Sequence, residues 1–209
     1  MFARDRDLLV LEPGVFREVA WLGQRLVRGV GSVSGTAMTM TSQDTGFDEA
    51  EVGEGHVVVI EGVALEVLSR TSGSELQVSR LRASDSGAAL GVGTIVDGVV
   101  EVSTFAPQLA IVHEQVARML GLGSPGGAAP TEADVVNPED LRLVEALGAL
   151  HLVYAAASAA GAEGMASKAA MYRERFSAER QRVVARVDLD GDGAPDAVRR
   201  MNVVALTRG

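Results

Sequence analysis

The chain has 209 residues, of which 47% are hydrophobic and 22% are charged, a composition typical of one or two soluble globular domains. It contains no cysteine, which excludes disulfide bonds and cysteine-ligated metal sites. Its formal net charge of -9 argues against a protein that grips nucleic acid through the phosphates, because that function needs a basic surface. No apolar run reaches the roughly 20 residues of a membrane span, and the first residues, MFARDRDLLVLE, lack the apolar centre of a signal peptide. We therefore expect synthesis in the cytoplasm and no membrane partner.

The first predicted element is a helix from Pro13 to Val30. Proline suits the first turn of a helix, and the Gly29-Val-Gly31 sequence favours a turn that ends it. Apolar residues recur at helical spacing between these limits, at Val15, Val19, Leu22 and Leu26.

A change of period after this helix predicts short strands. Residues 36–41 (TAMTMT) alternate, and the apolar runs 56–60 and 63–68 are joined by a tight-turn pair, Glu61-Gly62. Further runs cover residues 76–81 and 93–102, and the second is interrupted by Asp97-Gly98, a hairpin signal. Strands this short, with turns at regular intervals, predict an antiparallel barrel or meander of four to six strands.

The helical period returns after Thr104. One stripe is ended by Gly121, and Asn137-Pro138-Glu139-Asp140 then predicts a helix start, with a capping side chain and a first-turn proline. This helix continues into an Ala-rich stretch, Ala155–Ala160, which we expect to be buried between helices. The apolar positions of the three predicted helices are Leu109, Val112, Val116 and Met119; Leu143, Leu147, Leu150 and Tyr154; and Met165, Ala169, Tyr172, Phe176 and Val183.

The last residues, Val183 to Arg208, read as a β-hairpin, because two β-branched runs flank an Asp/Gly-rich centre. The predicted fold class is therefore α+β. It has a helical core of about four helices (residues 1–35 and 104–182), an inserted small antiparallel β-barrel or meander lobe (36–103), and a C-terminal β-hairpin (183–209).

The centre of the hairpin also has the spacing of a calcium-binding loop, through Asp188, Asp190, Asp192 and Asp196. Such a loop needs a bidentate glutamate at its last ligand position, where this chain has Arg199. The flanks also read as strands rather than as the two helices of an EF-hand. The pattern favours a solvated turn whose acids pair with Arg199 and Arg200, with weak ion binding as the alternative. No cofactor is expected.

No catalytic motif stands out. The sequence has no G-x-S-x-G elbow, no phosphate-binding P-loop and no dinucleotide-binding glycine motif. His56, His113 and His151 lie alone in different elements, so we expect them to be structural or exposed. The acidic stretch Asp44–Glu54 is most simply a solvated loop, although a hydrolase using an acid pair is a third possible interpretation. We expect no enzyme activity.

Two parts of the chain carry a resemblance to a known family. Residues 137–208 combine two helix sequences, Leu141-Arg-Leu-Val-Glu-Ala-Leu and Lys168-Ala-Ala-Met-Tyr-Arg-Glu-Arg-Phe, with the DxDxDGxxD hairpin and its Arg-Arg-x-Asn-Val-Val strand. The run from Gly55 to Arg82 is typical of β modules in phage virion proteins. Together they resemble the head–tail connector (adaptor) proteins of tailed bacteriophages and of phage-like gene-transfer particles, over about two-thirds of the chain.

The resemblance implies a structural protein of the virion neck, made in the host cytoplasm. Copies would form a ring, twelve-fold in that family, below the portal protein, and would offer a docking surface to stopper or tail-terminator proteins. DNA would pass through the channel without sequence-specific binding. The interface residues expected in the last helix and hairpin are Lys168, Tyr172, Arg175, Val187, Leu189, Arg199, Arg200, Val203, Val204 and Leu206. The alternative function is a calcium-dependent binding module that uses the Asp188–Asp196 loop.

Overall fold

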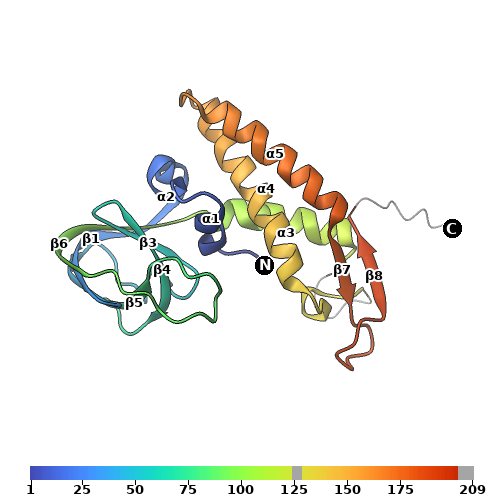
Figure 1. Ribbon diagram of the computed structural model, residues 1–209, viewed down its shortest axis with the longest axis horizontal. Helices are drawn as coiled ribbons and strands as arrows, with labels where there is room; N and C mark the ends of the chain where they lie inside the picture. Colours follow the sequence, from blue (N-terminus) through green and yellow to red (C-terminus); the bar gives the residue numbers. More distant parts are fainter. Residues whose placement is uncertain (124–128, 202–209) are drawn as a thin grey trace. The chain divides into compact units, whose positions relative to one another are not determined.

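The computed structural model describes residues 1–123 and 129–201, and its fold class is α+β, as predicted (Figure 1). In these residues there are five α-helices, a closed six-stranded antiparallel β-barrel and a two-stranded hairpin. The chain divides into two compact units. One comprises Arg4–Pro107 and holds the barrel; the other combines Met1–Ala3 with Gln108–Gly209 and holds the long helices and the hairpin.

The barrel confirms the predicted β lobe and lies at the upper limit of its predicted strand number. Its strands are β1 (Gln24–Ser34), β2 (Ala37–Gln43), β3 (Val57–Ile60), β4 (Val63–Arg70), β5 (Glu75–Ser79) and β6 (Thr94–Thr104). They close in the order β1-β2-β5-β4-β3-β6. Alternate side chains point inward and fill the barrel, as expected for a small closed sheet. The buried core consists of Val27, Val33, Met38, Met40, Phe47, Val52, Val58, Ile60, Leu65, Val67, Leu76, Val78, Val100 and Val102.

The predicted helix from Pro13 to Val30 is wrong. Three short elements precede the barrel, α1 (Asp5–Leu11), α2 (Val15–Glu18) and the 3-10 helix η1 (Ala20–Leu22), and β1 begins directly after them. Residues 24–34 pair with both β2 and β6, so residues 4–35 belong to the barrel unit rather than to the helical core, which of the first 35 residues includes Met1–Ala3 alone. The apolar residues between Pro13 and Val30 are spaced as in one helix, but they belong to short helices and to the start of a strand. Residues 24–34 form a strand because their backbone groups pair with β2 on one side and with β6 on the other.

The two glycines that predicted a turn, Gly29 and Gly31, lie inside β1. A Cβ atom at Gly29 would collide with the backbone of Ser42 on the neighbouring strand, so glycine allows β1 and β2 to approach closely. The predicted hairpin at Asp97-Gly98 is also wrong, because β6 runs through these residues. Asp97 has a positive φ of 49°, and the register with β1 shifts beside it, so the Asp-Gly pair forms a bulge instead of a hairpin turn.

The second unit is built on three long helices, α3 (Ala106–Leu120), α4 (Pro138–Ala159) and α5 (Met165–Arg182), with a short 3-10 turn, η2 (Glu132–Asp134). Helices α4 and α5 lie side by side (Figure 1). In the described part of the chain, α4 is the one helix long and apolar enough to cross a membrane, but 61% of that window is buried, as in the core helix of a soluble protein. The Ala-rich end of α4 is less buried than predicted, since only Ala157 of residues 155–160 is fully enclosed.

Helix α4 begins after Asn137, as predicted, but the Asn137 side chain does not cap it. Its amide donates to the Val184 carbonyl at 2.8 Å, and its oxygen accepts the Arg186 N–H at 2.7 Å. Asn137 therefore ties the start of α4 to the hairpin strand β7 (Val184–Val187).

The predicted C-terminal hairpin is confirmed, with β7 paired antiparallel to β8 (Ala197–Arg200). The second edge of β7 is covered by residues 134–136. The Val136 N–H donates to the Arg186 carbonyl at 3.0 Å, and Val135 forms a bridge with Val187. The three predicted interface residues Val203, Val204 and Leu206 lie outside the described residues.

Candidate functional site

The exposed part of the last helix is smaller than the sequence suggested. Tyr172 is 1% exposed and stacks on Tyr154, with ring centroids 5.6 Å apart and planes 7° from parallel. The Lys168 ammonium lies 5.0 Å from the Tyr154 ring, and the Arg175 guanidinium lies 5.6 Å from the Tyr172 ring. This stack holds α4 and α5 together through cation–π and aromatic contacts. Lys168 and Tyr172 therefore serve the fold, whereas Arg175 stays exposed.

The predicted interface residues of the hairpin also differ in their exposure to solvent. Val187 is fully buried, while Leu189 is 56% exposed at the turn. The Arg199 side chain donates to the carbonyl oxygens of Leu120 (2.8 Å) and Gly121 (2.9 Å), where α3 ends. A guanidinium at this end of a helix satisfies free carbonyls and complements the helix dipole. Arg199 thus fastens the hairpin to α3 instead of pairing with the acidic turn.

Of the two strands of the hairpin, the outer strand β8 is the more exposed. Val198, which is not among the interface residues predicted from the sequence, is 64% exposed, and Arg200, two residues further on, is also exposed. Among the described residues, β8 pairs only with β7. A groove of about 570 Å³ lies against this strand, lined by Arg118, Met119, Leu120, Gly121, Val198, Arg199 and Arg200. No local pattern marked this surface, because its residues come from α3 and β8.

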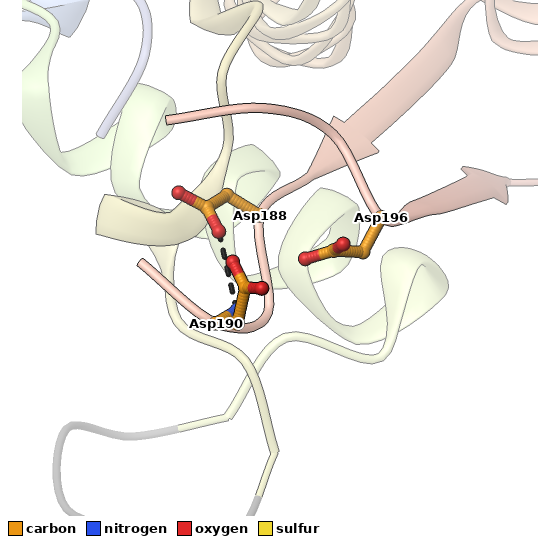
Figure 2. A group of neighbouring side chains, drawn as sticks. All are labelled: Asp188, Asp190 and Asp196. Carbon is orange, nitrogen blue, oxygen red and sulfur yellow. Dashed lines mark hydrogen bonds between the residues drawn. The ribbon is translucent and has the colours of Figure 1, made fainter. Parts of the chain in front are cut away.

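The predicted calcium loop brings three of its four acids together (Figure 2). Asp188, Asp190 and Asp196 each offer a carboxylate oxygen within 4.8 Å of the others, while Asp192 accepts the Ala194 N–H outside this group. The Asp188 carboxylate accepts N–H bonds from Gly193 (2.8 Å) and Gly191 (2.7 Å), which lower the pKa of Asp188. Backbone N–H groups of the turn therefore satisfy much of the hydrogen-bonding capacity of its carboxylates.

One histidine has acidic partners that the sequence did not reveal. His113 Nδ1 lies 2.5 Å from Glu145 Oε1, and its Nε2 lies 3.2 Å from Glu132 Oε2. Glu145 is fully buried and also accepts the backbone N–H groups of Phe2 (2.9 Å) and Ala3 (2.8 Å). Burial raises the pKa of Glu145, against the opposing effect of these hydrogen bonds. Separate helices bring His113 and Glu145 together, so no sequence spacing could indicate the pair.

The contacts of His113 are those of a structural residue that links α3 to α4 through Glu145. A pocket of about 740 Å³ lies beside it, lined mostly by apolar residues. Thr131 is the one hydroxyl among the described lining residues, and it donates to Asp134 at 3.0 Å rather than to the histidine. These residues therefore do not form the nucleophile–base pair that covalent catalysis requires.

The other two histidines bind the backbone of their surroundings. His56 Nδ1 lies 3.0 Å from the Gly53 carbonyl oxygen, and His151 Nδ1 lies 3.1 Å from that of Ala169. Both are contacts with backbone carbonyl oxygens, as expected for structural histidines.

The acidic stretch Asp44–Glu54 is a well-anchored loop. Phe47 and Val52 are buried in the barrel core, and Arg70 donates to both of their carbonyl oxygens, at 3.0 and 3.1 Å. The acidic residues of this stretch are exposed, namely Asp44, Asp48, Glu49, Glu51 and Glu54.

A buried ion cluster lies elsewhere in the barrel unit. Glu66 is fully buried and accepts bonds from Arg6 (2.5 Å) and Arg82 (2.7 Å). Burial by itself would raise the pKa of Glu66, but the two guanidinium groups outweigh it and lower the pKa. The cluster connects α1, β4 and the segment after β5, which is a structural role.

The fold and the exposed surface define an α+β protein whose helical unit presents an outer strand with an arginine-lined groove. No protein-family model, no curated protein and no solved structure matches this chain.

Proposed function

We propose that this chain is a non-enzymatic virion protein that forms the head–tail connector (adaptor) ring below the portal. In this role it extends the DNA channel and offers a docking surface to neck or tail proteins. The observation that carries the proposal is the outer strand β8, whose Val198 and Arg200 side chains are exposed at the end of the α4–α5 helix pair. An outer strand is a ready means of joining a subunit to a neighbour, because it can accept a further strand.

Fewer residues are exposed for this role than the sequence led us to expect. Of the expected residues, Arg175, Leu189 and Arg200 are exposed, and Val198 joins them. Tyr172 and Val187 are buried, so they support the contact surface from within.

The charge of the chain supports the channel role. A net charge of -9 repels phosphate, and a channel wall that repels DNA lets it pass without being held. The exposed carboxylates of residues 44–54 contribute to this charge in the barrel unit.

The proposal is tested by assembly with the portal protein of the same phage or phage-like particle. Purified portal rings are mixed with the protein, and the product is examined by electron microscopy and sedimentation. We expect a ring of added density below the portal, and we expect the variant Val198→Asp with Arg200→Glu to lose it. Arg173→Glu, on an exposed part of α5, is the control and should assemble normally. Neck density that is unchanged in particles lacking this protein would overturn the proposal.

A second candidate function is calcium-dependent binding, which the grouping of Asp188, Asp190 and Asp196 favours. Calorimetric titration with calcium separates it from the assembly role. Asp190→Ala is the informative variant, because Asp190 accepts a single backbone N–H, from Asp192 at 3.2 Å, whereas Asp188 accepts those of Asp190, Gly191 and Gly193. A calcium response that is lost in Asp190→Ala would support this second function.

A further inference from the structure

The hairpin sheet has one covered side and one outer strand. Strand β7 is enclosed between β8 and residues 134–136, where Asp188 N–H donates to the Asp134 carbonyl at 2.8 Å. In the described part of the chain no strand pairs with the outer edge of β8. Figure 1 shows β8 on the side of β7 away from α4. The main-chain groups of that edge are therefore available to an added strand.

The groove beside β8 has a definite chemistry. Its guanidinium groups come from Arg118 on α3 and from Arg199 and Arg200 on β8, and none of the described residues that line it is acidic. Its apolar wall is formed by Met119, Leu120 and the exposed Val198. The bonds from Arg199 to the end of α3 fix the position of the strand against the helix. The groove is thus pre-formed, basic and partly apolar.

We infer that β8 and this groove bind an extended acidic segment of a partner protein, which adds to the hairpin as a third strand. The inference rests on the proposed assembly function and names the chemistry of the partner segment. Alternate residues of an added strand point to opposite faces, and Val198 and Arg200 share the exposed face of β8 because they are two residues apart. An apolar residue and a carboxylate two positions apart in the partner segment can therefore cover Val198 and meet Arg200, and a further carboxylate can meet Arg118.

A peptide fits this surface better than a nucleic acid does. Strand addition uses main-chain donors and acceptors, which a nucleic acid lacks, and the apolar wall offers no phosphate contact.

The test uses the full chain and four synthetic probes in isothermal titration calorimetry. The first is an acidic peptide, Thr-Val-Val-Asp-Thr-Glu, which carries an apolar residue and two acids on one face when it is extended. The second replaces its acids with lysine, the third replaces its second valine with proline, and the fourth is a short single-stranded oligonucleotide. We expect the acidic peptide to bind, with an affinity that falls at high salt. The proline peptide should bind about tenfold more weakly because it loses a strand hydrogen bond and its extended pairing, and the other two should not bind measurably.

The variants locate the site. The double variant Arg118→Ala with Arg200→Ala should bind the acidic peptide about tenfold or more weakly, because two charge-assisted contacts are removed. The control is Arg28→Ala with Arg173→Ala, which removes the same charge from exposed positions outside the groove and should bind normally. Circular dichroism of each variant shows whether it is folded.

Equal binding of the proline peptide, equal binding by the groove variant, or preference for the oligonucleotide would each overturn the inference. These results leave the portal-assembly experiment to decide the proposed function separately. A ring that forms normally with the groove double variant would refute only the inferred strand addition.

Discussion

Asp5, at the start of α1, allows a quantitative test of the barrel unit. Asp5 is 4% exposed, and its carboxylate accepts the Phe105 N–H at 2.8 Å. Burial raises the pKa of Asp5 from 3.8 to about 6, although hydrogen bonds from Thr104 and Phe105 and the charge of His56 oppose the rise. Because the folded state binds this proton more tightly than the unfolded state, Asp5 favours folding increasingly as the pH falls from above 6 towards 4.

The size of the effect follows from the two pKa values. Their difference corresponds to about 3 kcal/mol when the proton is fully bound in both states, and to about 2 kcal/mol between pH 7.5 and pH 4.5. In Asp5→Asn the side chain keeps an oxygen for the Phe105 N–H but has no proton to gain. As the pH falls from 7.5 to 4.5, the natural chain should therefore gain about 2 kcal/mol in free energy of unfolding relative to Asp5→Asn.

Urea unfolding at a series of pH values measures this difference. The single tryptophan, Trp21, lies in the barrel unit and reports its unfolding by fluorescence. Asp44→Asn is the control, because a hydrogen bond from Arg28 N–H lowers the pKa of Asp44. The natural chain should therefore lose stability relative to Asp44→Asn as the pH falls, which is opposite in sign to the change expected for Asp5→Asn. Parallel pH profiles for the natural chain and Asp5→Asn would refute the assignment of a raised pKa to Asp5.

Three substitutions test other contacts by urea unfolding followed by circular dichroism. Arg199→Ala removes the bonds to the end of α3 and should cost about 1–2 kcal/mol, whereas Arg200→Ala should be nearly neutral; equal losses would contradict this role for Arg199. Gly29→Ala forces the β1 and β2 backbones apart and should cost about 1–3 kcal/mol, in contrast to Gly53→Ala, where nothing lies within 4 Å. Tyr172→Ala empties the α4–α5 stack and should cost about 3–5 kcal/mol, so a loss below about 1 kcal/mol would refute its structural role.

Local patterns predicted the elements whose partners are close in sequence. Strands β3 and β4 follow from two apolar runs around Glu61-Gly62, and they pair across that turn. The start of α4 follows from Asn137 and Pro138, since the proline has no N–H to lose in a first turn. The same patterns failed where distant pairing competed with local preference, as in residues 24–34 and at Asp97.

The candidate surface was predicted only in part, for a related reason. Burial separates Tyr172 and Val187 from Arg175 and Leu189, and burial depends on what packs against each side chain. Val198 was not selected because an alternating strand of four residues does not reveal which face meets the protein.

The sequence by itself determined the α+β class, five of the six barrel strands (β2 to β6), the long helices and the closing hairpin, because each follows from periodicity and turn chemistry within a short window. The tertiary structure alone decided that residues 24–34 close the barrel and that Glu145 holds His113. It also decided that Arg199 reaches the end of α3 while β8 stays the outer strand. These features join residues far apart in the chain, and only the folded backbone brings such groups within hydrogen-bonding distance.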